Sequence, residues 1–360
     1  MIPFFGCKRE YETHRWEYLK IIDSVMSTGQ LLQGEVVEKL ESMLGQSARR
    51  EFSIAVNSCT DALFLSLKAA GVGPGDEVLV PAFSFLASAS CVARIGATPV
   101  FVDIGENYNI PDKNISDKVT DRTKAVIFVS LFGDMKGIHG IRQFANIFNL
   151  TMIEDAAQSF GSLAGIRPGG YFGDVSCFSF DPTKPISALG SGGAVVTDNE
   201  DIANKIRMYR YHGKQGDSFN IPGYNSQMPT ISAAVLSAKL NKDRFWKKVR
   251  TDIASKYFEC FEYIQDVSIR IPDPWDGQSN YHKFVIEVPN RQELRKFLWQ
   301  HEIDTKVHYP YTLPELFGDM GRYPNAERAR DHCLSLPIHP FLSTDEVVHI
   351  AETVKEFYGG

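Results

Sequence analysis

Polar residues that could act together on a phosphate-bearing ligand follow the ends of several apolar runs. The first group is "NSCTD" at 57–61, which follows the run "FSIAV" and opens a helical pattern. Backbone N–H groups at a helix N-terminus bind phosphate readily, because they point outward where the helix dipole is positive. By itself, however, Ser58 or Thr60 is more simply interpreted as an N-cap that satisfies the start of the helix.

The second group is the acidic pair that ends the run "TMIED" at 151–155. A carboxylate at the end of an apolar strand is unfavourable unless it has a cationic or hydrogen-bonding partner. Asp155 is therefore a candidate for contact with a cationic ligand. A helix cap is an equally good interpretation of Asp155 when the segment is considered alone.

The third group lies in "SFDPTKPISALGSGG" at 179–193, where Ser179 ends a strand-like run and Lys184 follows five residues later. A single loop lysine is usually a solvated surface residue. Combined with a phosphate site and a buried acid, however, the Lys184 amine predicts pyridoxal 5'-phosphate. That cofactor needs a lysine that bonds to it, an acid at its pyridine nitrogen and anchors for its phosphate.

A parallel sheet would bring these groups together. Apolar runs alternate with helix-length segments, and they occupy 52–56, 77–81, 98–103, 125–130, 151–155, 175–180 and 193–198. This alternation predicts an α/β fold with a mainly parallel seven-stranded sheet covered by helices on both faces. Ligands of such sheets bind at the carboxyl ends of the strands, which is where the three groups lie.

The pattern of charged and apolar residues changes near residue 240. A basic helical stretch, "AKLNKDRFWKKVRTDIASKYFECF", is followed by the strand-like "NYHKFVIEV" and by helical patterns at "RQELRKFLWQHEI" and "TDEVVHIAETVKEFY". We predict a large cofactor-binding domain at 1–240 and a smaller C-terminal α+β domain at 241–360. Residues 11–46 predict two helices around "STGQLLQG", and packing of these helices on the small domain is left open.

Composition excludes several classes of protein. A formal net charge of -6 argues against general nucleic-acid binding, because such surfaces carry a basic excess. The six cysteines and nine histidines show no metal-binding spacing, so no metal site is expected, and the scattered thiols predict a cytoplasmic, reducing location. No long uninterrupted apolar segment is present, which argues against export and membrane spanning.

An ordered series of motifs resembles the DegT/DnrJ/EryC1/StrS family of nucleotide-sugar aminotransferases. The motifs include "NSCTDALFLSLKAAGVGPGDEVLVPAFSFLASA", "MIEDAAQSFGS", "FSFDPTKPISALGSGGAVVTD", "GYNSQMPTISAA" and "VHYP". The resemblance implies a PLP-dependent transferase of fold type I, like aspartate aminotransferase. It also implies transfer of an amino group from L-glutamate to a 3-keto or 4-keto nucleotide-linked deoxysugar for O-antigen, glycan or antibiotic biosynthesis. The nucleotide would be dTDP or UDP, and pyridoxamine phosphate (PMP) would form between the two half-reactions.

The same resemblance assigns roles around the cofactor ring. Lys184 would hold the cofactor covalently and act as general base, and Asp155 would face the pyridine nitrogen. Gln158 would contact the region of the ring hydroxyl. Phe85 would lie over the ring face, although a core phenylalanine is the simpler interpretation of that residue taken alone.

The remaining roles concern the phosphate, the partner subunit and the substrate. Cys59, Thr60 and Ser179 would hold the phosphate. Asn225, in "GYNS", would reach the phosphate of the neighbouring subunit, which implies a homodimer with shared active sites. His308 is a candidate substrate residue, and a satisfied structural histidine is an equal alternative.

The sequence departs from the family pattern at three positions, and two other functions were considered. Cys59 stands where glycine is common, Ser191 where glutamate is common, and Gln227 where a basic residue is common. A PLP/PMP-dependent sugar dehydratase is one alternative, but such relatives replace the lysine by histidine. A catalytically silent sugar-binding or regulatory homologue is the other, and the intact set of Lys184, Asp155, Gln158 and Ser179 argues against it.

Overall fold

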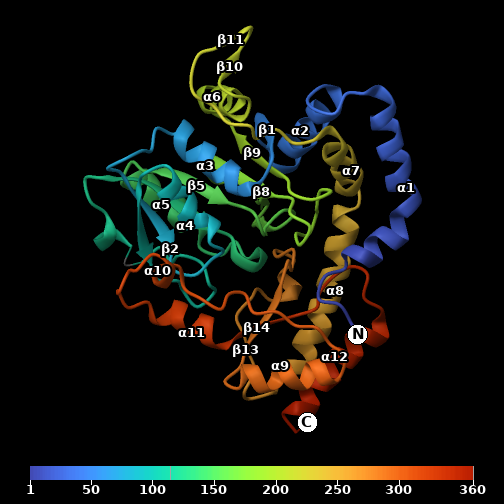
Figure 1. Cartoon of the computed structure of the whole chain (residues 1–360). Coiled ribbons are helices and arrows are strands. Elements are labelled where there is room, and N and C mark those ends of the chain that lie inside the picture. Colours follow the sequence, from blue (N-terminus) through green and yellow to red (C-terminus); the bar gives the residue numbers. More distant parts are fainter. Residues whose placement is uncertain (114, 360) are drawn as a thin grey trace.

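The computed structural model, which describes residues 1–113 and 115–359, is built around one seven-stranded sheet (Figure 1). Its strands are β1 (Phe52–Val56), β2 (Glu77–Pro81), β3 (Thr98–Val102), β4 (Thr123–Val129), β5 (Thr151–Asp155), β8 (Val175–Ser179) and β9 (Gly193–Thr197). Their order is β1-β9-β8-β5-β4-β2-β3. β9 runs antiparallel to both of its neighbours, β1 and β8, whereas the other described neighbouring pairs of this sheet are parallel. The predicted strand runs and the mainly parallel sheet are confirmed.

Helices cover both faces of this sheet, which explains why its strands are apolar throughout. Along β4, Ile127 belongs to the core cluster beneath α3, whereas its neighbours Val126 and Phe128 belong to the cluster beneath α5. Successive side chains of a strand point to opposite faces, so every position of a doubly covered strand is buried. The helices involved are α2 (Glu35–Ala48), α3 (Cys59–Ala69), α4 (Ala87–Arg94), α5 (Ile138–Ile147), α6 (Glu200–Arg210) and α7 (Thr230–Leu240).

The C-terminal part is a smaller α+β unit around an antiparallel sheet. Its elements are α8 (Asp243–Phe261), β12 (Ser268–Ile269), β13 (Phe284–Glu287), α9 (Arg291–Gln300), α10 (Leu313–Leu316), α11 (Pro324–His332), β14 (Cys333–Leu336) and α12 (Thr344–Phe357). The basic stretch that we expected to be one helix is broken between Leu240 and Asp243. The break coincides with the predicted domain boundary at 240/241, and the boundary itself stays a prediction.

The N-terminal helix α1 (Cys7–Thr28) bridges the two parts of the chain. Its Arg9 makes two hydrogen bonds, of 2.6 and 2.7 Å, to the carboxylate of Glu346 in α12. Ile2 pairs with Ile303 of the small unit, and the rest of α1 runs along α7 toward α2 (Figure 1). The two predicted N-terminal helices are therefore present, and α1 reaches the small unit through its first turn.

Short hairpins complete the chain at β6 (Leu163–Ala164) with β7 (Arg167–Pro168), and at β10 (Lys214–Gln215) with β11 (Ser218–Phe219). Within the described ranges, no helix is both long and apolar enough to cross a membrane. The prediction of a cytoplasmic location is a separate matter, and it stays a prediction.

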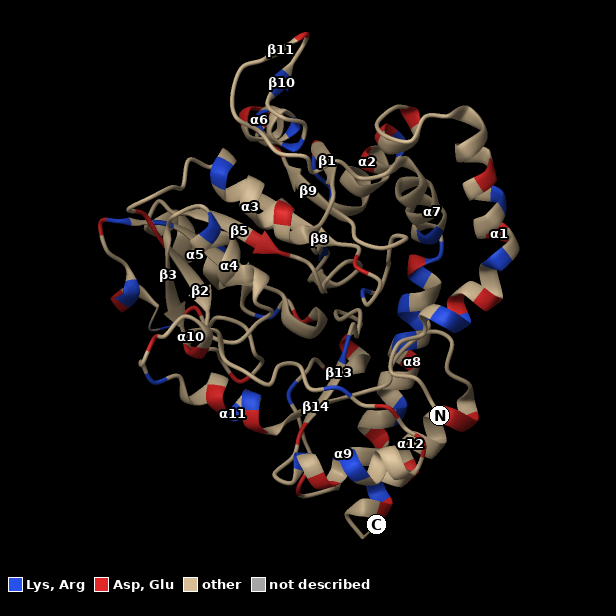
Figure 2. Cartoon of the chain, viewed as in Figure 1, with Lys and Arg blue, Asp and Glu red and all other residues tan. Residues whose placement is uncertain are grey.

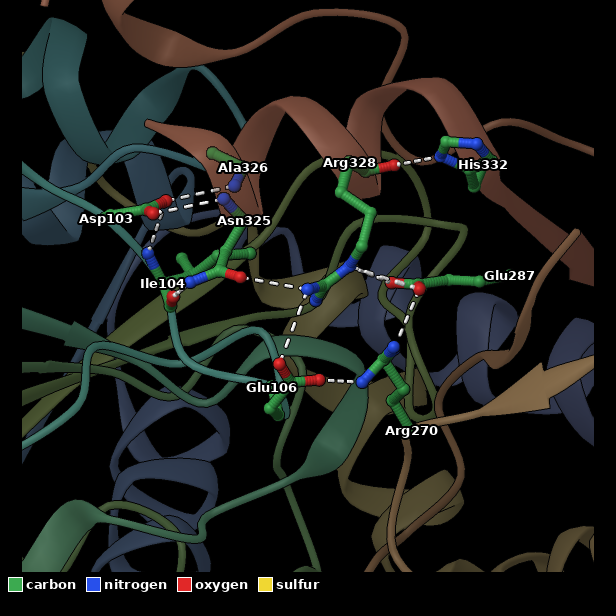
Figure 3. Close-up of polar contacts among 9 residues, drawn as sticks. All are labelled: Asp103, Ile104, Glu106, Arg270, Glu287, Asn325, Ala326, Arg328 and His332. Atoms are coloured by element: carbon green, nitrogen blue, oxygen red, sulfur yellow. Dashed lines mark hydrogen bonds and ion pairs between the residues drawn. The ribbon is translucent and has the colours of Figure 1, made fainter. Parts of the chain in front are cut away.

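An ion-pair network joins the loop after β3 to the small unit (Figure 3). Glu287, at the end of β13, accepts from Arg270 at 2.7 Å and pairs with Arg328 of α11 at 3.3 Å. Both guanidinium groups also pair with Glu106 of the large part. Asp103 in the same loop accepts the backbone N–H groups that begin α11, and this fixes the helix against the large part.

We predict that Glu287→Gln destabilises the protein by about 1–3 kcal/mol, because it leaves two arginines beside a neutral group that was their buried partner. Glu287 is 6% exposed, so water cannot replace the lost carboxylate. Thermal and urea unfolding measure the change. Lys248→Met is the matched control, because its pair with Asp252 is exposed and should contribute little. An equal effect of both substitutions would show that the Glu287 network is not a stabilising contact.

Candidate active site

A cavity of about 490 Å³ lies where the large sheet meets the small unit. Eight of the nine predicted site residues line it, and these are Cys59, Thr60, Phe85, Asp155, Gln158, Ser179, Lys184 and His308. The fold places the ends of β5 and β8 and the start of α3 at this point. These eight residues therefore converge as expected from the sequence. The ninth, Asn225, was expected to act in the neighbouring subunit, and that role stays a prediction.

Asp155 ends β5 and lines the cavity. In Figure 2, the red end of β5 is formed by Glu154 and Asp155. The Oδ1 of Asp155 accepts the Ala157 N–H at 3.2 Å, and its Oδ2 accepts the Ser88 hydroxyl at 3.0 Å. Burial raises the pKa of Asp155, and Lys184 and these donors oppose the rise. The carboxylate thus has two fixed donors and is exposed on one side to a ligand that fills the cavity.

Glu154, one residue earlier, points to the other face of the sheet and has a different task. Its carboxylate accepts the N–H groups of Gly170, Phe172 and Gly173 and the hydroxyl of Ser176, at 2.7–3.2 Å. Burial raises its pKa, and these four donors oppose the rise. Glu154 therefore holds the segment before β8, and it does not line the cavity.

Lys184 enters the cavity from a tight turn after β8. The side chain of Asp181 accepts the Thr183 N–H at 2.9 Å, and its carbonyl accepts the Lys184 N–H at 2.9 Å. A turn of this kind, in which a side chain bonds to the backbone two residues on, directs the following residue. Burial lowers the pKa of Lys184, so the amine loses its proton more easily than an exposed lysine and becomes a better nucleophile.

The start of α3 has the properties of a phosphate site. Ser58 is the N-cap, because its side chain accepts the Asp61 N–H at 3.2 Å, which confirms the simpler interpretation for this residue. In the described part of the chain, the N–H groups of Cys59 and Thr60 donate to no protein atom. Gly193 packs directly against this turn, where a Cβ atom would lie 2.4 Å from the Ser58 backbone. The residues present therefore fit a phosphate group.

Gln158 and Phe85 form another part of the wall. The amide of Gln158 is fixed at both ends, since Oε1 accepts the Phe132 N–H at 2.9 Å and Nε2 donates to the Tyr309 hydroxyl at 3.1 Å. Phe85 lies with its ring centroid 6.0 Å from that of Tyr309. It is 52% exposed although it lines the cavity, so a large apolar face is open to a planar ligand or to a second chain.

His308 and Asn225 differ in their positions. His308 lines the cavity, and its Nδ1 lies 2.9 Å from the Ser335 hydroxyl. Burial lowers the pKa of His308 to about 2, so the ring is neutral at physiological pH. Asn225 is exposed, pairs with Tyr211 and is not among the residues that line the cavity of its own chain.

Several residues of the cavity wall were not predicted from the sequence, and among them are Phe5, Asp181, His282, Lys283 and Tyr309. Ser88, which donates to Asp155, was not predicted either. Tyr309 follows the predicted residue His308 in the motif "VHYP", so this motif could have indicated Tyr309 as well. His282 and Lys283 lie in "NYHKFVIEV", which was interpreted only as a strand. Phe5 comes from an apolar N-terminal segment that carries no motif, and only the folded chain places it here.

Comparison with known proteins agrees with this geometry and defines the class as an aminotransferase fold. The model of the "DegT/DnrJ/EryC1/StrS aminotransferase family" matches residues 13–355. The chain therefore belongs to this family. The resemblance stated from the motifs is confirmed.

Similar proteins with curated names cover nearly the whole chain. A pleiotropic regulatory protein of Geobacillus stearothermophilus is 35% identical over 99% of this chain and 98% of its own length. The dTDP-3-amino-3,4,6-trideoxy-alpha-D-glucose transaminase of Streptomyces venezuelae is 34% identical, over 99% of this chain and 96% of its own. The UDP-2-acetamido-2-deoxy-3-oxo-D-glucuronate aminotransferase of Pseudomonas aeruginosa is 33% identical, over 96% of this chain and 98% of its own length.

Solved structures show the same fold. S. venezuelae DesV, in complex with a ketimine intermediate, has a TM-score of 0.95 and is 33% identical, with 100% of this chain and 99% of that chain covered. Bacillus subtilis NtdA, with bound cofactor PMP, has a TM-score of 0.92 and is 27% identical, with 100% of this chain and 85% of that chain covered. The expected transferase fold is confirmed.

We predict that Glu154→Gln destabilises the cofactor-free protein, whereas Asp155→Asn does not. A glutamine at 154 has one acceptor oxygen for four donors, which costs about 1–3 kcal/mol. An asparagine at 155 satisfies both of its partners, because its oxygen accepts from Ala157 and its amide donates to Ser88. It also removes a buried charge. Thermal unfolding at pH 7 should show a loss for Glu154→Gln and a gain or no change for Asp155→Asn.

The effect at Asp155 should depend on pH in a defined direction. Because its pKa is raised in the folded protein, the ionised carboxylate destabilises the fold as pH rises from the ordinary aspartate range, about 4, through that raised value. The advantage of Asp155→Asn should therefore be present at pH 7 and shrink toward pH 4. A loss at pH 7 as large as that of Glu154→Gln would mean that Asp155 serves mainly as a structural acceptor.

Proposed function

We propose that this protein is a pyridoxal phosphate-dependent aminotransferase that moves an amino group from L-glutamate to a nucleotide-linked deoxysugar. The acceptor is the 3-keto or 4-keto group of a dTDP- or UDP-sugar, and the product serves O-antigen, glycan or antibiotic sugar biosynthesis. The observation that carries the proposal is one cavity that holds the Lys184 amine, the Asp155 carboxylate and the unpaired N–H groups at the start of α3. Family membership and the two sugar transaminases among its relatives support the substrate class.

The residues of the cavity fit the cofactor. When bound, pyridoxal phosphate withdraws electrons from the carbon whose C–H bond breaks and carries the amino group between the two substrates. The N–H groups of Cys59 and Thr60, with the Ser179 hydroxyl, would hold its phosphate. Phe85 would cover a ring face, and Gln158 would contact the region of the ring hydroxyl.

Two side chains perform the proton chemistry. Asp155 keeps the pyridine nitrogen protonated, because an anion favours the positively charged form of a neighbour in a buried site. The Nζ of Lys184 would hold the cofactor, and the free amine of this residue would act as the base. Its Nζ then takes the proton from Cα of glutamate, and in the second half-reaction it delivers a proton to the sugar carbon that receives the nitrogen. The tether of the side chain keeps the base beside both carbons.

A regulatory role without catalysis is the second candidate, since one relative carries that name. The buried amine at Lys184 and the buried carboxylate at Asp155 favour the enzyme. Both groups are desolvated, which is unfavourable for a fold that needs only to bind a sugar. The intact lysine likewise argues against the dehydratase alternative.

The active enzyme is proposed to be a homodimer with shared sites. Apolar side chains are exposed at Phe85, Leu86 and Leu189, at 37–52%, and Phe85 belongs to the cavity wall. A second copy that covers them would remove apolar surface from water and close the cavity. Asn225, exposed in its own chain, would then reach the phosphate of the opposite subunit.

We predict that the purified protein, given pyridoxal phosphate and L-glutamate, aminates one member of a panel of dTDP- and UDP-linked 3-keto and 4-keto sugars, as detected by product mass. Lys184→Ala should lose this transfer while keeping the fold. After borohydride reduction, mass spectrometry should find the cofactor attached to the peptide that contains Lys184 in the wild type only. Normal turnover by Lys184→Ala, or failure of every sugar in the panel with a cofactor-loaded wild type, would refute the proposal.

We further predict complementation between subunits. Lys184→Ala and an inactive variant at Asn225 are unfolded and refolded together in equal amounts. Random pairing makes about half of the dimers hybrid, and each hybrid has one intact site of two, so activity should return to about a quarter of wild type. Each variant refolded alone is the control. A mixture that stays inactive although hybrid dimers are seen by native mass spectrometry would rule out a shared role for Asn225.

A further inference from the structure

A second lysine, Lys283, lies buried in the wall of the same cavity. It precedes β13 of the small unit and is 5% exposed, and it lines the cavity together with Lys184. Its amine lies 5.0 Å from the ring centroid of Phe4 and 4.6 Å from that of Phe5. The small unit and the N-terminal segment therefore place a cation opposite the residues that come from the large sheet.

Within the described residues, the Lys283 amine forms no ion pair. Across residues 1–113 and 115–359, no carboxylate lies within 4 Å of it, and it donates no hydrogen bond to a protein atom. Two aromatic faces stabilise an ammonium only in part, whereas burial of an unpaired charge is strongly unfavourable. Burial accordingly lowers the pKa of Lys283, and the nearby charge of Lys184 lowers it further, whereas the charge of Asp181 opposes the shift without pairing with the amine. The position is thus unfavourable for folding and suited to receive an anion.

The other charged or titratable groups of the cavity are accounted for by other roles. Under the proposed function, Asp155 would face the pyridine nitrogen, and the start of α3 would hold the cofactor phosphate. Burial keeps the rings of His282 and His308 neutral, because it lowers the pKa of each. Asp181 bonds to the turn that carries Lys184. Lys283 is left as the cation of the small unit for a second anion, separate from the phosphate.

From this placement we infer that Lys283 binds a carboxylate of the amino-acid donor, so that it is a donor-specificity residue of the active site. An amino acid carries its α-carboxylate on the same carbon as the nitrogen that reacts, so this anion must lie close to the position of the Lys184 amine. The diphosphate of a nucleotide sugar is attached to C1, across the sugar ring from a ketone at C3 or C4. Lys283 lines the same cavity as Lys184. A cation at this place therefore suits the carboxylate of the amino acid better than the diphosphate of the nucleotide sugar. This inference rests on the proposed aminotransferase function.

The test compares Lys283→Met with wild type in each half-reaction, and Lys306→Met is the control. Lys306 belongs to the same unit, pairs with Asp304 and does not line the cavity. In Lys283→Met, the glutamate concentration that half-saturates single-turnover amino transfer should rise about 10- to 100-fold, the effect of losing one charge-assisted contact. The sugar half-reaction and cofactor content should be unchanged, and Lys283→Arg should recover part of the affinity for glutamate.

A binding measurement separates this inference from the proposed function. Calorimetry with 2-oxoglutarate on cofactor-loaded protein needs no turnover, and it should show binding by wild type and Lys306→Met but loss of affinity in Lys283→Met. Without ligand, Lys283→Met should unfold at the same or a higher temperature, because an unpaired buried charge is gone. Equal affinity in wild type and Lys283→Met, or a defect confined to the nucleotide sugar, overturns the inference. A wild type that binds 2-oxoglutarate through Lys283 but aminates no sugar refutes the proposed acceptor alone.

Discussion

The alternation of side chains along β5 is the constraint on which the site depends. It sends two adjacent buried carboxylates to opposite faces of the sheet, where they meet different partners. Glu154 is fully satisfied by four donors and fixes the segment that leads into β8. Asp155 receives two donors and keeps one side toward the cavity. A shift of one residue in this strand would exchange the two environments and remove both functions at once.

The cavity itself is a joint product of two folding units. The large sheet supplies the start of α3, Asp155 and Lys184, whereas the small unit supplies Lys283, His308 and Tyr309. The ion pairs around Glu287 and the contact between Arg9 and Glu346 fix the position of the small unit relative to the large part. Residues that lie far from the cavity therefore help to determine its shape, because they set the relative placement of its two halves.

The large sheet and most of the cavity wall could be predicted from the sequence, because each depends on local signals. Apolar runs of strand length gave all seven strands, and polar residues at strand ends gave Asp155, Ser179 and the start of α3. The family motifs supplied Phe85, Gln158 and His308. Lys283 and Phe5 escaped prediction, since their place in the site depends on how the small unit and the N-terminus fold back on the large sheet. The break between α7 and α8 was also missed, because charged residues at 242–244 continue the helical pattern across it.

Cys59 stands at a position that glycine commonly occupies in the family, and its sulfur lies 4.0 Å from Oδ1 of Asp155. A thiolate beside a reactive aldehyde would add to it and compete with the lysine for the carbonyl carbon. Burial raises the pKa of Cys59, and the neighbouring carboxylate raises it further, so the sulfur stays protonated and weakly nucleophilic. The same electrostatics should protect this thiol from alkylating reagents and from peroxide. The acid that is proposed to face the cofactor ring thus also keeps protonated the one sulfur that lines the cavity in the described chain.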